Sequence, residues 1–213
     1  MKQGILVAFF IASTIYNSAS ISHEEKAVTS QPLHYLVNTD TNILLNVPYV
    51  HQVDDLPEDK KPQIMASACG PTAINMILKY IGEDIDLYSV IERLPDSVYI
   101  KGKMFYNLYE GPGYFGKETK RISKDPQAIY QALKDRNPII LNIQNYNGMI
   151  GHAVVIVGIR NFDGKTAESL IVHDPYVGPY REFKYINETT IKQPEGFNNY
   201  IGILDPFYVV NSD

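Results

Sequence analysis

The sequence predicts an α+β domain in which helices come first and antiparallel strands follow. In the first part of the chain, apolar residues recur every three or four positions, as they do on one face of a helix. After Pro138, short apolar runs separated by turn residues replace that spacing, as is typical of strands. The 213 residues contain no repeat and no low-complexity tract, so we expect a single domain.

Residues 1–20 have the three regions of a secretory signal peptide. Lys2 supplies a positive start, an apolar stretch runs from Ile5 to Ile15, and Ser18-Ala19-Ser20 is a small-residue cleavage site. The apolar stretch is too short to span a bilayer as an anchor. We therefore expect cleavage, no stable membrane insertion, and a secreted, periplasmic or cell-surface protein.

The mature chain is acidic and contains one cysteine. The whole sequence has 19 basic and 24 acidic residues, and removal of Lys2 lowers the net charge to −6. Because no basic patch is present, we expect no nucleic-acid partner. A single cysteine excludes an intramolecular disulfide even in an oxidising compartment. A free thiol in such a compartment is expected to be either buried or reactive.

Residues 21–42 are polar and are expected to form an N-terminal arm, which could act as a pro-segment. The domain is predicted to span residues 43–213. It opens with Ile43 to Gln52, a strand that bends at Pro48. The charged stretch 54–62 has the composition of an exposed loop.

The first helix is predicted to begin near Cys69. Pro71 suits its first turn, Ser67 or Cys69 can serve as its cap, and Gly82 follows it as a C′ glycine. Unpaired backbone N–H groups and the helix dipole stabilise a thiolate at that end. Cys69 therefore has the setting of a nucleophile, although free cysteines are more often small core residues. The apolar residues that share one face are Ala73, Ile74, Ile77, Leu78 and Ile81.

Further helices and strands complete the prediction. The stretch from Tyr99 to Lys124 is rich in glycine and aromatic residues, and it fits a long loop that either touches a ligand or packs over the core. The other elements are helices from Asp86 to Leu94 and Ser123 to Arg136, strands from Ile139 to Gln144, His152 to Arg160, Glu168 to His173 and Tyr180 to Ile186, and a last edge strand from Tyr200 to Leu204.

The strand-rich half supplies a base and an orienting carboxylate for the cysteine. His152 begins one apolar strand and Asp174 ends the next, so a hairpin between the two strands can bring them side by side. His173 is a rival base. Because adjacent strand residues point to opposite faces, His173 and Asp174 face one site only if the strand bends at Pro175. We therefore prefer His152.

The remaining histidines give no metal site. His23, His34 and His51 have no metal-ligand spacing with the cysteine or with any carboxylate. We expect no metal and no cofactor.

Four segments of the chain form a further pattern: Val47-Pro48-Tyr49-Val50-His51-Gln52, Ala68-Cys69-Gly70-Pro71-Thr72-Ala73 with its helix ending in Tyr80-Ile81-Gly82, Gly151-His152-Ala153-Val154-Val155-Ile156-Val157-Gly158, and Val172-His173-Asp174-Pro175. Taken in order, they resemble the bacteriocin-processing-peptidase-like (double-glycine-peptidase-like) branch of the papain-like cysteine peptidases. The resemblance covers roughly residues 43–205. It implies a papain-like fold, in which a helix headed by the cysteine packs on an antiparallel sheet that carries the histidine. By this match Cys69 would be the nucleophile, His152 the base and Asp174 the residue that orients it.

The resemblance also implies a glutamine that holds the oxyanion. This glutamine maps onto Gln52 through the Val-Pro-Tyr motif, 17 residues before Cys69. Gln63 lies six residues before Cys69, a separation that is also common in papain-like enzymes. We prefer Gln52 because the motif around it matches and Gln63 has none.

These residues predict an exported thiol hydrolase, and in particular a cysteine peptidase that acts on a peptide or protein substrate. An acyl or amide transferase would use the same residues but pass the acyl group to an amine. A non-catalytic peptide- or glycan-binding module on the same fold is the alternative from another class. Family members that process leader peptides cut after paired glycines and are fused to export transporters. This chain has a signal and no transporter, so the leader-peptide substrate is not carried over.

Overall fold

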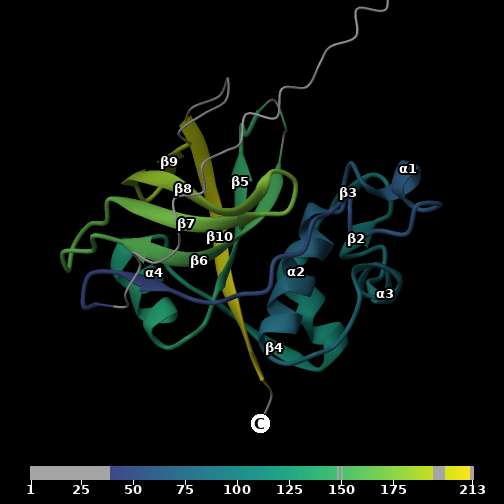
Figure 1. The fold of residues 1–213 in the computed structure, drawn as a ribbon, viewed down its shortest axis with the longest axis horizontal. Coiled ribbons are helices and arrows are strands. Elements are labelled where there is room, and N and C mark those ends of the chain that lie inside the picture. The colour runs from purple at the N-terminus through teal and green to yellow at the C-terminus, as the bar shows by residue number, and fades with distance from the viewer. Residues whose placement is uncertain (1–38, 148, 150, 194–199, 212–213) are drawn as a thin grey trace, which may run out of the picture. The chain divides into compact units, whose positions relative to one another are not determined.

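Eight antiparallel strands form the main sheet of the fold (Figure 1). The computed structural model describes residues 39–147, 149, 151–193 and 200–211. The strands pair in the order β1-β6-β5-β10-β9-β8-β7, and β4 pairs with β10. Because β7 also pairs with β6, the strands from β6 through β5, β10, β9 and β8 to β7 form a closed ring of pairings. The strands are β1 (Ile43–Leu44), β4 (Lys117–Arg121), β5 (Ile139–Gln144), β6 (His152–Arg160), β7 (Ser169–Asp174), β8 (Gly178–Asn187), β9 (Thr190–Lys192) and β10 (Tyr200–Asn211).

The helices come mostly before these strands, so the predicted mixture of helices and a strand-rich core is confirmed. Two helix N-termini are capped by aspartates: Asp86 accepts the backbone N–H of Ser89, and Asp125 accepts that of Ala128. The helices are α1 (Lys61–Ile64), α2 (Cys69–Tyr80), α3 (Leu87–Arg93), the 3₁₀ helix η2 (Leu108–Phe115) and α4 (Pro126–Lys134).

Helix α2 begins at Cys69 and ends where the sequence predicts. Gly82 has a φ of +94°, and the N–H groups of Gly82 and Glu83 bond back to the last turn as in a Schellman motif. The predicted cap is wrong. Ala68 occupies the N-cap position and has no polar group with which to cap the helix, and the Ser67 hydroxyl is bonded to that of Tyr99 at 2.9 Å.

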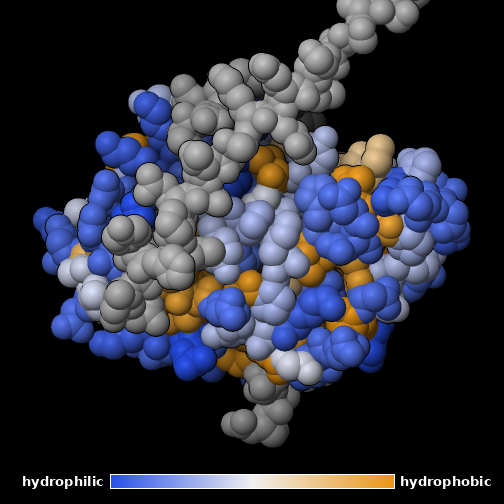
Figure 2. All heavy atoms as spheres, in the orientation of Figure 1, coloured by the Kyte–Doolittle hydropathy of each residue, from blue (hydrophilic) through white to orange (hydrophobic). Residues whose placement is uncertain are grey.

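Helix α2 is the most deeply buried helix of the described chain. Ten of its twelve residues are buried, and it contacts β6, eight of whose nine residues are buried. Figure 1 shows α2 between the strands on one side and, on the other, α1, α3 and the hairpin of β2 (Tyr99–Ile100) and β3 (Met104–Phe105). On the outside, Figure 2 shows hydrophilic residues over most of the face, with smaller apolar patches between them. Because α2 is packed against elements on both sides, the position of its N-terminus is well defined.

The stretch predicted as one aromatic loop is more regular than expected. It forms a hairpin of β2 (Tyr99–Ile100) and β3 (Met104–Phe105), then η2 and β4. Two glycines let the hairpin approach closely: Gly102 has a φ of +73° and lies against the backbone of Gln63, and Gly70 packs under Phe105. The hairpin was not predicted because strands of two residues are too short to show a periodic pattern. β4 was not predicted because its sequence is polar throughout.

The C-terminal strand corrects a second expectation. β10 runs for 12 residues, well past Leu204, and it pairs with β5, β9 and β4 and is therefore not an edge strand. The short β9 was not predicted. In contrast, β5 and β6 have the predicted bounds, and β1 is shorter than the predicted strand because only Ile43 and Leu44 pair in the ladder.

The N-terminal predictions lie largely outside the described residues. The signal peptide, and the arm up to residue 38, have no structural description, and both stay predictions together with the domain boundary at residue 43. Among the helices of the described residues, none combines the length and the apolar composition needed to cross a bilayer.

A glycine in β6 tests the close approach of β1. A Cβ at Gly158 would lie 2.6 Å from the carbonyl oxygen of Ile43, so we expect Gly158→Ala to lower the free energy of unfolding by about 1–3 kcal/mol. Gly113→Ala is the matched control, since a Cβ there meets nothing within 4 Å. Urea unfolding of the three proteins measures both changes. Equal unfolding midpoints for Gly158→Ala and the parent would contradict this packing.

Candidate active site

The site centres on a buried pair of side chains from neighbouring strands. His152 is the first residue of β6 and Asp174 the last residue of β7, and the antiparallel pairing of β6 with β7 places them side by side. The ring Nε2 of His152 lies 2.9 Å from Oδ1 of Asp174. The two side chains are 1% and 0% exposed. A histidine and a carboxylate buried together in this way need each other for charge and hydrogen bonding.

Asp174 accepts further hydrogen bonds on both carboxylate oxygens. The backbone N–H groups of Tyr176 and Val177 donate to Oδ1 at 2.9 and 3.2 Å, and the Tyr146 hydroxyl donates to Oδ2. Burial alone raises the pKa of Asp174, but the hydrogen bonds and the charge of His152 outweigh it and hold that pKa below its usual value. The carboxylate therefore stays ionised although it is buried.

Cys69 completes the constellation from the helical half. It is the first residue of α2, buried but still 6% exposed, whereas Ala73, Ile74 and Met76 further along the helix are 0% exposed. It interacts with the His152 ring. Burial lowers the pKa of His152, but Cys69 and Asp174 together raise it to about 10. A ring that holds its proton beside a sulfur favours a thiolate–imidazolium pair.

His173 has a different environment from His152. Its Nε2 bonds to the carbonyl oxygen of Val47 at 3.0 Å, and its Nδ1 accepts the backbone N–H of Tyr180 at 3.1 Å. A nitrogen that accepts an N–H carries no proton, so this ring is neutral, and burial lowers the pKa of His173 in agreement with that. Since both ring nitrogens are bonded to backbone groups, neither is left to act on the cysteine.

The two candidate glutamines differ sharply in position. Gln52 is 3% exposed, donates its side-chain N–H to the carbonyl oxygen of Met65 at 2.6 Å, and donates its backbone N–H to Pro175, the residue after Asp174, at 2.8 Å. Gln63 lies exposed on α1. The structure thus brings Cys69, His152 and Asp174 together and ties Gln52 to the segment that follows Asp174.

Tyr146 belongs to this cluster but was missed by the sequence reasoning. It lies in the connection between β5 and β6, and its ring stacks on that of His152 with 5.2 Å between centroids. The turn residues Asn145 and Asn147 on either side of it, just before the strand of the candidate base, were the signal that could have found it.

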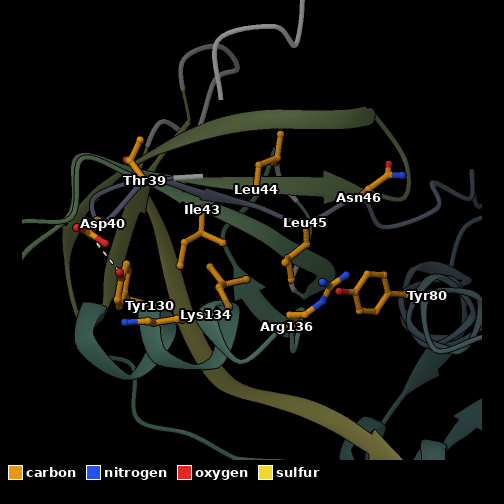
Figure 3. Close-up of a pocket in the computed structure, with 11 residues that line it drawn as sticks. Thr39, Asp40, Ile43, Leu44, Leu45, Asn46, Tyr80, Tyr130, Lys134 and Arg136 are labelled. Carbon is orange, nitrogen blue, oxygen red and sulfur yellow. Dashed lines mark hydrogen bonds between the residues drawn. The ribbon is translucent and has the colours of Figure 1, made fainter. Parts of the chain in front are cut away.

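A pocket elsewhere in the fold is not lined by Cys69, His152 or Asp174. It has a volume of about 610 Å³ and lies between β1 and α4 (Figure 3). In Figure 3 Arg136 faces Tyr80 at one end, and Lys134, Tyr130 and Asp40 gather at the other. Across the described residues, no group of three His, Cys, Asp or Glu side chains could hold a metal ion.

Comparison with known families shows which family the chain belongs to. The profile of the Peptidase_C39 like family matches residues 44–195, which contain Cys69, His152, Asp174 and Gln52. The chain belongs to the Peptidase_C39 like family. The match confirms the resemblance to bacteriocin-processing-type peptidases, and membership in the C39-like family indicates a cysteine peptidase. No curated protein matches the chain.

Two solved structures are similar to this C39-like chain. A C39-like peptidase from Bacillus anthracis is 17% identical, covers 82% of this chain and 100% of its own, and has a TM-score of 0.47. The peptidase domain of Streptococcus ComA, a bi-functional ABC transporter involved in a quorum-sensing pathway, is 19% identical, covers 70% of this chain and 96% of its own, and has a TM-score of 0.45.

Substitution of the two histidines separates their roles. His173→Leu removes the partner of the buried Val47 carbonyl and of the half-buried Tyr180 N–H, so we expect it to lower the free energy of unfolding by about 1–4 kcal/mol. The rate at which iodoacetamide alkylates Cys69 in the folded protein should stay unchanged. His152→Leu should slow that alkylation near neutral pH. If His173→Leu slowed it as much as His152→Leu, the choice of His152 would be wrong.

Proposed function

We propose that the chain is an exported cysteine peptidase of papain-like architecture, which cleaves peptide bonds through Cys69, His152 and Asp174. The observation that carries the proposal is the buried His152–Asp174 pair, whose ring also interacts with Cys69 at the head of α2. A nucleophile, a base and a residue that orients the base are the parts that acyl transfer by a thiol requires.

The proposed reaction has two halves. The Cys69 thiolate attacks the carbonyl carbon of the scissile amide, and the protonated His152 gives its proton to the leaving amine as the C–N bond breaks. A thioester to Cys69 remains. His152 then takes a proton from water, the resulting hydroxide attacks the thioester, and the acid product leaves as the thiolate forms again. Asp174 stays ionised and keeps the ring oriented throughout.

The oxyanion of each tetrahedral intermediate needs hydrogen-bond donors. The backbone N–H of Cys69 is one of those left unpaired at a helix N-terminus. Gln52 is the proposed second donor, because an amide nitrogen carries two hydrogens and one of them is committed to Met65. Gln63 is exposed on α1 and has no comparable tie to the site.

Apolar side chains near the site suit a peptide substrate. Met65 precedes Cys69 by four residues, and Met104 and Tyr106 flank Phe105, which packs on Gly70 beside the nucleophile. These three side chains are 41%, 49% and 55% exposed. Phe105 brings its strand against the helix that carries Cys69, and exposed apolar side chains are typical of a surface that binds a partner, so the proposed partner here is the peptide chain.

Export is proposed on the sequence alone. The positive start, the apolar stretch and the small-residue site in residues 1–20 match a cleavable signal. N-terminal sequencing of the protein recovered outside the cytoplasm tests this proposal, and a start near residue 20 supports it. Recovery of the full-length chain from the cytoplasm would contradict it.

Hydrolysis is tested with a peptide library read by mass spectrometry. Cys69→Ala and His152→Ala should abolish cleavage without unfolding the protein, because each removes a reacting group. Asp174→Ala should retain some residual activity. Equal cleavage by Cys69→Ala and the parent would end the catalytic assignment. Products are analysed with and without an added amine: free acids support a peptidase, and amides formed with the amine indicate a transferase.

The glutamine assignment has its own kinetic test. Gln52→Ala removes a proposed oxyanion donor, so we expect kcat on a cleaved library peptide to fall by about 10²-fold or more. Gln63→Ala is the matched control and should leave kcat near that of the parent. The reverse pattern would move the oxyanion role to Gln63.

A further inference from the structure

The Tyr146 ring is enclosed by aromatic neighbours in the core of the site. It stacks on His152 with an interplanar angle of 11° and a centroid distance of 5.2 Å, and it lies 6.1 Å from the ring of Phe183. Tyr146 and Phe183 are both 0% exposed. The His152 ring therefore has a flat, fixed surface along one face, which limits its rotation.

The backbone around Tyr146 adopts a tight conformation that presents this side chain. Asn145 and Asn147 have φ values of 61° and 47°, in the left-handed region that asparagine tolerates better than most residues. Tyr146 forms an isolated bridge with Met149, and the Asn147 side chain accepts a hydrogen bond from Gln193 at 2.9 Å. The connection between β5 and β6 is thus held at Tyr146 itself and at the residue that follows it.

The Tyr146 hydroxyl reaches the carboxylate oxygen that His152 does not use. Oδ1 of Asp174 accepts from His152 and from two backbone N–H groups, whereas Oδ2 accepts from Tyr146. Without that hydroxyl, Oδ2 would be a buried charged acceptor with one donor fewer, which is costly. The same side chain thus holds both members of the pair, one through its ring and the other through its hydroxyl.

We propose that Tyr146 is a positioning residue that keeps Asp174 ionised and His152 correctly oriented toward Cys69. The inference rests on the proposed function, since it gives Tyr146 a part in the same reaction without contact with the substrate. It extends the Cys69, His152 and Asp174 constellation by a fourth side chain from the β5–β6 connection.

The surrounding charges keep Tyr146 a hydrogen-bond donor. Burial and the charge of Asp174 raise the pKa of Tyr146, while Arg181 opposes this, so the phenol keeps its proton. The other titratable groups that act on the cluster are Cys69, through His152, and Tyr49, which Asp174 also influences.

The test is the pH dependence of Cys69 alkylation by iodoacetamide. In Tyr146→Phe the Asp174 carboxylate has one hydrogen-bond donor fewer, so it takes up a proton at a higher pH than in the parent protein. The thiolate–imidazolium pair is therefore lost at a higher pH as well. We expect the acid limb of the rate profile to move to higher pH by about one unit, which is about a tenfold loss of rate on that limb. An unshifted limb in a folded Tyr146→Phe variant would overturn the proposal.

Two comparisons separate positioning from packing. Tyr130→Phe also removes one hydroxyl bond, to the carbonyl of Asp40, and should leave the profile unchanged. In an Asp174→Ala background, Tyr146→Phe should change the rate no further, since its partner is gone. If Tyr146→Phe lowered the alkylation rate in the Asp174→Ala protein as much as in the parent protein, only packing would have been affected. 3-Fluorotyrosine at position 146 keeps the ring and strengthens the donor, so it should move the acid limb to lower pH, and a shift to higher pH would contradict the proposal.

The alkylation assay does not require a substrate. If the parent protein cleaves no peptide but Tyr146→Phe still shifts the acid limb, the positioning role stands and the peptidase proposal fails. If the parent cleaves peptides and Tyr146→Phe leaves the limb in place, the peptidase proposal stands and the positioning role fails.

Discussion

The ionised carboxylate of Asp174, buried at the end of β7, is the constraint on which the rest of the site depends. A charge in the core of a protein is tolerated only where hydrogen-bond donors and an opposite charge replace water. Here the donors come from three places along the chain: His152 from β6, Tyr146 from the connection before β6, and the backbone N–H groups of the turn after β7. The sheet must close β7 onto β6 for these groups to meet, so the pairing of the strands and the electrostatics of the site support each other.

The helical half adds the sulfur to this arrangement. Gly82 ends α2, the β2–β3 hairpin packs over its first turn at Gly70, and β6 lies along its side, so Cys69 has little freedom. The position of Cys69 at the start of a helix also gives a thiolate the favourable end of the dipole. Catalysis by such a pair needs both groups held before the substrate arrives, and burial of α2 and β6 against each other provides that rigidity.

The sequence predicts elements well where the local pattern matches the final environment. Helix α2 and strands β5 and β6 are mostly apolar on their buried surfaces, and their bounds follow from periodicity and turn residues. β4 is polar because it is largely exposed, and β10 contains Asp205 and Pro206 at an irregularity, so pairing between distant segments, rather than local pattern, decides both. The His152 and Asp174 neighbourhood was predictable from one hairpin. Tyr146 was not, because its role depends on a turn conformation and on a carboxylate 28 residues away.

The most direct test of the thiolate–imidazolium pair is the protonation of the His152 ring, read from its ¹⁵N chemical shifts by NMR at about pH 8. A free histidine is neutral at that pH, since its pKa is about 6.5. Interaction with Cys69 and Asp174 predicts a ring protonated on both nitrogens in the parent protein and a neutral ring in Cys69→Ala, where burial is no longer opposed by the sulfur. A neutral His152 ring in the parent protein at this pH would contradict the ion pair at the centre of this account.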